Sequence, residues 1–187
     1  VNAMELKISD FALNLKRFLD ILFSTLMLVI LSPLFLFLSV LIKIDSKGTI
    51  FYKQQRLGLY GKPFYIYKFR TMIEEAEKEG MPQLSSEGDC RITRIGKFLR
   101  KYRIDELPQF INVLLGDMSV VGPRPERAYF ESQIMERVPY FSIVHKVRPG
   151  ITSLGMVKYG YANSIEKMLD RLKYDIIYME NISLLLD

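Results

Sequence analysis

The chain has 187 residues, a formal net charge of +5, one cysteine and one histidine. One cysteine excludes a disulfide framework within the chain, and one cysteine with one histidine excludes a Cys/His zinc site. The positive charge is typical of proteins that meet nucleic acid, an anionic membrane surface or phosphorylated substrates.

The N-terminal part of the chain combines an amphipathic segment with an apolar one. Residues 1–20 are expected to hold a lead helix, with Phe11, Leu15 and Phe18 among the candidates for its apolar face. The run 21–42 then carries no charge over 22 residues. A helix of that length measures roughly 33 Å, enough to span a hydrocarbon core of about 30 Å. A membrane segment in a basic chain favours a membrane surface or a phosphorylated substrate over nucleic acid as the partner.

The dipeptide Ser32-Pro33 stands near the middle of this apolar run. Proline kinks or breaks a helix, and a serine hydroxyl can bond a carbonyl that the proline leaves free. Each half would reach roughly 14–17 Å, about half of the bilayer core. Lysine and arginine flank both ends of the run, and such residues mark cytoplasmic flanks. Two readings of 21–44 stay open on these grounds: a kinked single-pass helix, and a re-entrant helix-break-helix with both ends on the cytoplasmic face.

The rest of the chain, 45–187, is predicted to be one catalytic domain at the cytoplasmic face, so that the whole chain has one functional domain. Aromatic and β-branched residues flank a Gly/Pro turn within 49–72 and predict a β-hairpin. Residues 74–90 are polar and predict a helix end and a loop. The remainder is typical of helices, with interruptions near Pro108 and Pro139. The expected fold class is α+β, mostly helical with a small β-hairpin, preceded by the membrane segment and accompanied by amphipathic interfacial helices.

The adjacent carboxylates Asp105 and Glu106 are the densest candidate for chemistry, because Arg100, Lys101 and Arg103 lie within a few residues. A carboxylate beside a bound phosphate can act as a nucleophile or as a metal ligand. An acidic capping pair beside surface arginines is the alternative interpretation, and the pair alone does not exclude it.

Several cationic side chains are candidates for phosphate binding. Arg124 lies between two prolines, which fix the backbone and suit an arginine that binds two phosphate oxygens. Lys68 and Arg70 are two apart on the second strand of the expected hairpin, so alternation places them on one face. Arg148 precedes a Pro-Gly turn. Each of these has a simpler interpretation as a solvated turn or a charged edge strand.

The order of short motifs is the most specific feature of the sequence. After the Ser-Pro-broken run come KFRTM (68–72), D-x-R-x-T-x-x-G (89–96), DELPQ (105–109), N-x-L-x-G-D-M-S (112–119), GPRP (122–125) and VRPGIT (147–152). From about Leu15 to the C-terminus this order closely resembles that of the monotopic phosphoglycosyl transferases, a family of bacterial sugar transferases, in their minimal single-domain form.

The resemblance implies an activity, a membrane anchor and a location. Members of the family transfer a sugar 1-phosphate from a UDP-sugar to a polyprenol phosphate such as undecaprenyl phosphate. UMP is released, Mg²⁺ is required, and the transfer is the first membrane step of glycoconjugate assembly. The family's membrane segment is a re-entrant helix broken at Ser-Pro, here Ser32 and Pro33. The resemblance therefore places the protein in the bacterial inner membrane as a monotopic protein, with its catalytic domain on the cytoplasmic face.

The resemblance also implies roles for individual residues. Asp105 would be the nucleophile that forms a phosphosugar-enzyme intermediate and would contact Mg²⁺, while Glu106 would assist as metal ligand or proton handler. Arg124 would bind phosphate. Lys68, Arg70, Arg100 and Arg148 are weaker candidates for binding or supporting the site. Asp175 matches an acidic position of the family, with no role assigned.

The sequence also admits a function without catalysis. A non-enzymatic membrane-anchored module that binds anionic lipids would share the apolar run and the positive charge, but would not need Asp105 or Glu106. Family members usually continue beyond the motif NISLLLD (181–187) into a further amphipathic helix, so a truncated C-terminus is one expectation. No residue type in the sequence distinguishes one sugar, one glycan pathway or one oligomeric state from another.

Overall fold

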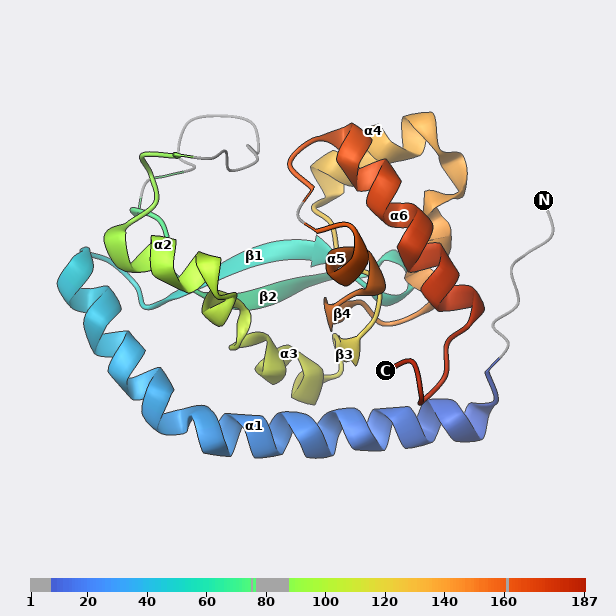
Figure 1. Ribbon diagram of the computed structural model, residues 1–187, viewed down its shortest axis with the longest axis horizontal. Helices are drawn as coiled ribbons and strands as arrows, with labels where there is room; N and C mark the ends of the chain where they lie inside the picture. The colour runs from blue at the N-terminus through green and yellow to red at the C-terminus, as the bar shows by residue number, and fades with distance from the viewer. Residues whose placement is uncertain (1–7, 75, 77–87, 161) are drawn as a thin grey trace.

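The computed structural model describes residues 8–74, 76, 88–160 and 162–187. The first residues of the expected lead helix (1–7) and most of the expected polar loop (77–87) lie outside the described residues. Figure 1 shows a mostly helical molecule with two small sheets and one long N-terminal helix that runs along its lower edge. The α+β class and the hairpin agree with the sequence-based prediction.

Helix α1 (Asp10–Asp45) includes both the expected lead helix and the apolar run in one element of 36 residues. The Ser9 hydroxyl accepts a hydrogen bond from the Ala12 amide and caps its start. From Asp10 on, the expected lead helix is continuous with the apolar run, because no proline or glycine stands between Asp10 and Ser32. By length and composition α1 is long and apolar enough to cross a membrane.

The helix continues through Pro33, although Figure 1 shows that it is bent. Proline cannot donate to the carbonyl of Val29, four residues earlier. The Ser32 hydroxyl donates to that carbonyl oxygen instead, at 2.8 Å. Serine therefore satisfies the acceptor that proline leaves without its usual donor, and the bend costs no buried backbone hydrogen bond.

The two faces of α1 have opposite character. Side chains of its inner face are buried against the rest of the molecule, namely Lys16, Asp20, Ser24, Leu38 and Ile42. Large apolar side chains lie on its outer face, including Phe11, Phe18, Leu22, Leu26, Val29, Leu36, Phe37, Val40 and Ile44. Phe11 and Phe18, candidates for the apolar face of the lead helix, belong to this outer face and are 76% and 61% exposed. A soluble helix would show the reverse arrangement.

Polar contacts attach the first half of α1 to the domain. Asp20 accepts hydrogen bonds from the Ser119 hydroxyl at 2.7 Å and from the Val120 amide at 3.1 Å. Lys16 lies 3.9 Å from Asp20 and 2.5 Å from Asp187. Buried polar groups need such partners, so this inner face fixes where α1 lies on the domain.

The hairpin consists of β1 (Phe51–Leu57) and β2 (Pro63–Phe69), joined by the short 3-10 helix η1 (Leu59–Gly61). The strands are antiparallel, with Phe51 opposite Phe69 and Leu57 opposite Pro63. Phe69 packs with Leu38 and Ile42 of α1 and with Leu99 in one hydrophobic cluster. The hairpin is therefore held against the second half of α1.

Short helices then lead to a parallel strand pair. They are α2 (Arg94–Lys101), the 3-10 helix η2 (Ile104–Glu106) and α3 (Gln109–Leu115), separated near Pro108 as the sequence predicts. Gly116 ends α3 with a φ of 94°, which suits glycine. Strand β3 (Ser119–Val121) follows and pairs in parallel with β4 (Gly150–Thr152).

The C-terminal helices form the remaining core. They are α4 (Ala128–Arg137), the 3-10 helix η3 (Pro139–Lys146), α5 (Leu154–Lys158) and α6 (Ile165–Glu180). Pro139 separates α4 from η3 as expected, and the Ser164 hydroxyl caps α6 by accepting from the Lys167 amide. Apolar residues of α4, η3 and α6 bury one another in the largest cluster, which includes Phe130, Ile134, Phe141, Leu172 and Met179. This core lies behind the loop that connects β3 to α4.

Candidate active site

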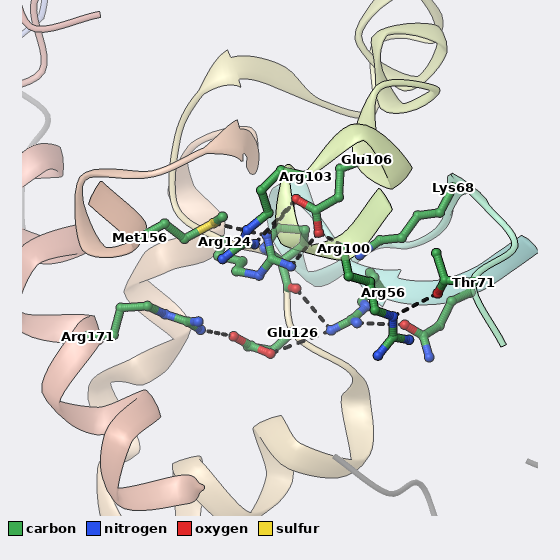
Figure 2. Close-up of polar contacts among 12 residues, drawn as sticks. Arg56, Lys68, Thr71, Arg100, Arg103, Glu106, Arg124, Glu126, Met156 and Arg171 are labelled. Atoms are coloured by element: carbon green, nitrogen blue, oxygen red, sulfur yellow. Dashed lines mark hydrogen bonds and ion pairs between the residues drawn. The ribbon is translucent and has the colours of Figure 1, made fainter. Parts of the chain in front are cut away.

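Charged side chains from four parts of the fold converge around η2. Figure 2 shows Glu106 of η2 facing Lys68 of β2 and Arg124 of the loop between β3 and α4, with Arg56 of β1 close by. Glu106 and Arg124 are 18 positions apart, and Glu106 and Lys68 are 38 apart. Only the tertiary fold brings these three side chains together.

The backbone of η2 turns both acidic side chains inward. Arg103, just before it, has a left-handed φ of 58°, which reverses the chain after α2. Asp105 and Glu106 are only 7% and 5% exposed. The alternative interpretation, an acidic capping pair beside surface arginines, does not fit this burial, because a capping pair lies at the surface and this pair does not.

Glu106 is the hub of the cluster. Its Oε1 accepts from Lys68 Nζ at 2.7 Å and from Arg124 Nη2 at 2.8 Å. Arg103 Nη1 lies 3.7 Å from its Oε2. Burial opposes ionisation of Glu106, but Arg124 and Lys68 outweigh burial and hold the pKa of this carboxyl well below its ordinary value. Glu106 is thus a fixed anion whose oxygens are occupied by cations.

Asp105 differs from its neighbour. Its Oδ1 is buried and has no hydrogen-bond partner among the residues that the structure describes. Burial raises the pKa of this carboxyl, as does the nearby charge of Glu106, while Lys68, Arg100 and Arg103 counteract the rise. A buried carboxylate oxygen without a donor costs free energy, and such groups are typical of functional sites.

The cations around the acidic pair are themselves held. Burial lowers the pKa of Lys68, and Glu106 partly restores it. Arg100 Nε donates to the Thr71 hydroxyl at 2.8 Å, and this hydrogen bond holds the Arg100 side chain beside the segment that follows β2 (Figure 2). Arg124 Nη1 donates to the sulfur of Met156 at 3.0 Å. These contacts reduce the freedom of the cations before any ligand binds.

The loop that carries Arg124 is fixed through its backbone. The Gly122 amide donates to the Thr152 carbonyl at 3.1 Å, and the Gly150 amide donates to the Pro123 carbonyl at 2.9 Å. A Cβ on Gly122 would lie 2.4 Å from the Arg148 carbonyl oxygen, so only glycine permits this approach. The GPRP and VRPGIT motifs are therefore the two sides of one backbone contact.

Two of the predicted phosphate-binding residues lie away from this cluster. Arg70 follows the end of β2 and donates to the carbonyls of Lys47 and Ser46, both at 2.7 Å, at the C-terminal end of α1. Arg148 is exposed and donates to the Gly116 carbonyl at 3.0 Å, at the end of α3. Both arginines bind the carbonyl ends of helices, where cations are favourable.

Asp175, which the sequence left without a role, supports the same loop. It is buried on α6, and its Oδ1 accepts from the Gly155 amide at 3.0 Å. Burial raises the pKa of this carboxyl, against hydrogen bonds from Gly155, from the Ser153 hydroxyl and from the Arg124 backbone amide. Asp175 therefore ties α5, α6 and the Arg124 loop together.

Sequence reasoning missed four side chains that the structure brings to the site or its support, namely Arg56, Arg103, Glu126 and Arg171. Arg103 was noted only as a neighbour of the acidic pair. Glu126 directly follows the GPRP motif, so its position was the available signal. Arg56 and Arg171 lie in segments whose pattern predicts only a strand and a helix.

The donor set limits how a metal ion could bind. Within the described part of the chain, no group of three or more His, Cys, Asp or Glu side chains could hold a metal by itself. Mg²⁺ commonly takes one or two carboxylates and completes its shell with water and substrate phosphates. The free Oδ1 of Asp105 fits that use. Glu106 fits it less well, because Lys68 and Arg124 both bind its Oε1, and Arg124 and Arg103 lie 3.5 and 3.7 Å from its Oε2.

Comparison with known proteins identifies one family model and several similar sugar transferases. Residues 11–187 match the family model described as bacterial sugar transferase. The chain is 44% identical over 173 residues to the UDP-N-acetylgalactosamine-undecaprenyl-phosphate N-acetylgalactosaminephosphotransferase of Aeromonas hydrophila, covering 92% of this chain and 41% of that protein. It is 41% identical over 174 residues to the UDP-glucose:undecaprenyl-phosphate glucose-1-phosphate transferase of Klebsiella pneumoniae, covering 92% and 37%.

A shorter relative matches over most of its own length. The exopolysaccharide production protein PSS of Rhizobium leguminosarum bv. phaseoli is 41% identical over 181 residues, which cover 94% of this chain and 90% of that protein. The chain thus spans about two fifths of the first two relatives and nearly all of the third.

Proposed function

Because this chain belongs to the bacterial sugar transferase family, we propose that it transfers a sugar 1-phosphate from a UDP-sugar to a polyprenol phosphate and releases UMP. The relatives from Aeromonas hydrophila and Klebsiella pneumoniae are named for this type of reaction with undecaprenyl phosphate. The sugar of this chain stays open, because those two names differ in it.

One observation carries the proposal: a buried carboxylate oxygen of Asp105, with no donor in the described part of the chain, lies beside a cluster of cations that Glu106 binds. A nucleotide sugar diphosphate brings negative charge, and Lys68, Arg100, Arg103 and Arg124 provide positive charge around η2. Because no side chain or amide in the ranges that the structure describes donates to this carboxylate oxygen, it is available to a phosphorus atom. An anionic-lipid module would need the cations but not a desolvated carboxylate.

The proposed mechanism has two displacements at one phosphorus atom. An Asp105 oxygen forms a bond to the β-phosphorus of the UDP-sugar, and the bond to the α-phosphate oxygen breaks, so the electron pair leaves with UMP. A phosphate oxygen of the polyprenol phosphate then attacks the same phosphorus. The Asp105 O–P bond breaks, the carboxylate is restored, and a polyprenyl diphosphate sugar is formed.

The protein's own residues perform the electrostatic work in this scheme. Arg124 and Lys68 would face the charge that develops on the equatorial oxygens and on the leaving phosphate, and they would need little reorganisation because Glu106 already holds them. Mg²⁺, held by Asp105 and substrate phosphate oxygens, would supply further neutralisation of the diphosphate.

Helix α1 is proposed to be the membrane anchor of this enzyme, entering the cytoplasmic face of the inner membrane and returning to it. Its outer face is apolar on both sides of Pro33, its inner face is bound to the domain, and it is bent. Such an anchor keeps the acidic pair near the interface, where a water-soluble nucleotide sugar and a lipid phosphate meet. The boundary between anchor and catalytic domain is proposed at residues 44–45.

The test is UMP release by the full chain in detergent or liposomes. The protein is incubated with undecaprenyl phosphate, Mg²⁺ and each of several UDP-sugars. We expect release with at least one sugar, and no release above background from Asp105→Asn. Absence of release with every sugar, or wild-type release from Asp105→Asn, would contradict the proposal and leave an anionic-lipid module as the better account.

A further inference from the structure

A second buried charge cluster lies directly behind the active-site cations. Glu126 ends the loop that carries Arg124 and is only 6% exposed. Its Oε1 accepts from Nη2 of Arg171 on α6, and its Oε2 lies 3.5 Å from Nη1 of Arg56 on β1. Figure 2 shows Glu126 between these two arginines, on the opposite side of the loop from Glu106.

The same elements hold the backbone of this loop. Arg56 Nη1 also donates to the Pro125 carbonyl at 3.2 Å, and the Leu57 amide donates to the Glu126 carbonyl at 3.2 Å. On the other side, Asp175 of α6 accepts from the Arg124 amide. Residues 124–126 are thus hydrogen-bonded to β1 on one side and to α6 on the other. The Arg124 side chain extends from this segment to Glu106.

The negative charge of Glu126 offsets the burial of Arg56 and Arg171 and the repulsion between Arg56 and Arg124. Burial, together with the neighbouring Arg124, lowers the pKa of Arg56 to about 10 against the opposing effect of Glu126. Without the carboxylate, Arg56 and Arg171 would be buried cations that lack their paired anion and keep only the weaker attraction of Glu106 and Asp175, and Arg56 would repel Arg124. The loop would then move to relieve the repulsion, and Arg124 would move with it.

We infer that Glu126 is a positioning residue: clamped between Arg56 and Arg171, it fixes the loop so that the Arg124 guanidinium points at Glu106 and at the substrate phosphate. The inference rests on the proposed function, because it assigns the clamp to the same site. Glu126 itself is buried behind the loop and contacts no substrate. Its effect on transfer passes through Arg124.

A double-mutant cycle separates positioning from general stability. Glu126→Gln keeps the size of the side chain and removes the charge, and Arg124→Lys keeps a cation but loses the planar fork. We expect Glu126→Gln to lower kcat for UMP release by about ten- to a hundredfold in the wild-type background. In the Arg124→Lys background we expect at most about a twofold further loss, because the side chain that Glu126 positions is already changed.

Glu166→Gln is the matched control. Glu166 pairs with Arg137 at 2.7 Å, but both side chains are more than half exposed, and neither contacts the site. This variant should keep wild-type kcat in both backgrounds. Wild-type kcat from Glu126→Gln, or an equal loss in both backgrounds, would overturn the inference. If Glu126→Gln does not fold, Arg171→Lys replaces it in the same cycle, with the same expected results.

A spectroscopic readout tests the clamp without relying on activity. The Met156 sulfur lies 3.0 Å from Arg124 Nη1, so the ¹³C resonance of its terminal methyl group reports where the guanidinium lies. Met156→Leu assigns the signal. Glu126→Gln should shift it, and Glu166→Gln should not. An unshifted signal in Glu126→Gln overturns the clamp. A wild-type protein that releases no UMP with any UDP-sugar overturns the proposed function instead, while the methyl signal still decides the clamp.

Discussion

At the scale of single residues, two adjacent carboxylates have opposite environments. Glu106 is surrounded by cations, whereas Asp105 keeps a buried oxygen with no donor among the described residues. An arrangement of this kind separates the roles of the two groups: one is a structural anion that orients cations, and the other is held ready for chemistry.

Matched amide substitutions should therefore separate stability from activity. Glu106→Gln leaves Lys68 and Arg124 buried without their anion, so we expect a loss of about 3–5 kcal/mol of unfolding free energy together with activity. Asp105→Asn removes a desolvated charge, so we expect activity to vanish while stability is unchanged or higher. Thermal or denaturant unfolding of both variants measures the difference. A larger stability loss in Asp105→Asn than in Glu106→Gln would contradict this account.

The pH dependence of transfer follows from two pKa shifts. In the proposed mechanism Asp105 attacks as a carboxylate, and burial raises its pKa, so activity should fall with decreasing pH at values above the ordinary 3.8 of aspartate. Lys68 acts as a cation, and burial lowers its pKa, so activity should fall with increasing pH at values below the ordinary 10.5 of lysine. The expected profile of kcat/KM against pH is bell-shaped, and both of its limbs lie between the ordinary pKa values of aspartate and lysine. An acid limb at or below 3.8, in protein shown to be folded by circular dichroism, would contradict it.

At the scale of elements, α1 combines an apolar outer face with an inner face that is polar in its first half and apolar in its second, and this arrangement suits a helix between lipid and protein. Lys16, Asp20 and Ser24 are buried toward the domain, while Phe18, Leu22 and other apolar side chains point outward. The bend at the middle of the helix is compatible with the proposed return to the cytoplasmic face, because Ser32 compensates for the donor that Pro33 lacks.

Cysteine labelling tests that topology. In a Cys90→Ser background, Asn14→Cys and Lys47→Cys place one thiol before and one after the apolar run. For a re-entrant α1 we expect neither thiol to react with a membrane-impermeant maleimide in intact cells, and both to react after permeabilisation. Wild-type Cys90, which is exposed, is the control for the side on which the domain lies. Reaction of one flank from outside would establish a spanning helix.

Pro33→Ala then tests whether the proline is decisive for this topology. The substitution restores a backbone donor and removes the clash with the preceding turn, so α1 should straighten. One of the two reporter thiols should become reactive from outside. If both flanks of Pro33→Ala stay protected, the attachment of the inner face to the domain determines the topology instead.

At the scale of the whole molecule, local patterns predicted the elements better than they predicted their assembly. The hairpin, the interruptions at Pro108 and Pro139 and the cap at Ser164 follow from turn and capping chemistry, which acts within a few residues. The motif order predicted the family, and the family match confirms it. Lys68, Glu106 and Arg124 were predicted separately, from residue type and from the family resemblance.

The remaining features depend on contacts that no local pattern reports. Alternation along β2 predicts Arg70 beside Lys68, but the strand ends at Phe69 and Arg70 turns to the end of α1 instead. Glu126 and Arg171 are 45 positions apart and meet only because α6 packs behind the loop. The buried polar residue Asp20 on the inner face of α1 likewise has its hydrogen-bond donors on β3, about 100 positions away, so no local pattern predicts its burial.

The central claim is that Asp105 carries the sugar phosphate covalently between the two substrates. The most direct test incubates the full chain with its UDP-sugar and Mg²⁺ in the absence of polyprenol phosphate, and measures UMP together with the mass of the peptide that contains Asp105. The account predicts a burst of UMP of at most one equivalent per enzyme, with a mass gain equal to the sugar phosphate on that peptide, and neither in Asp105→Asn. Release of UMP only when polyprenol phosphate is present, with no change in peptide mass, would contradict it.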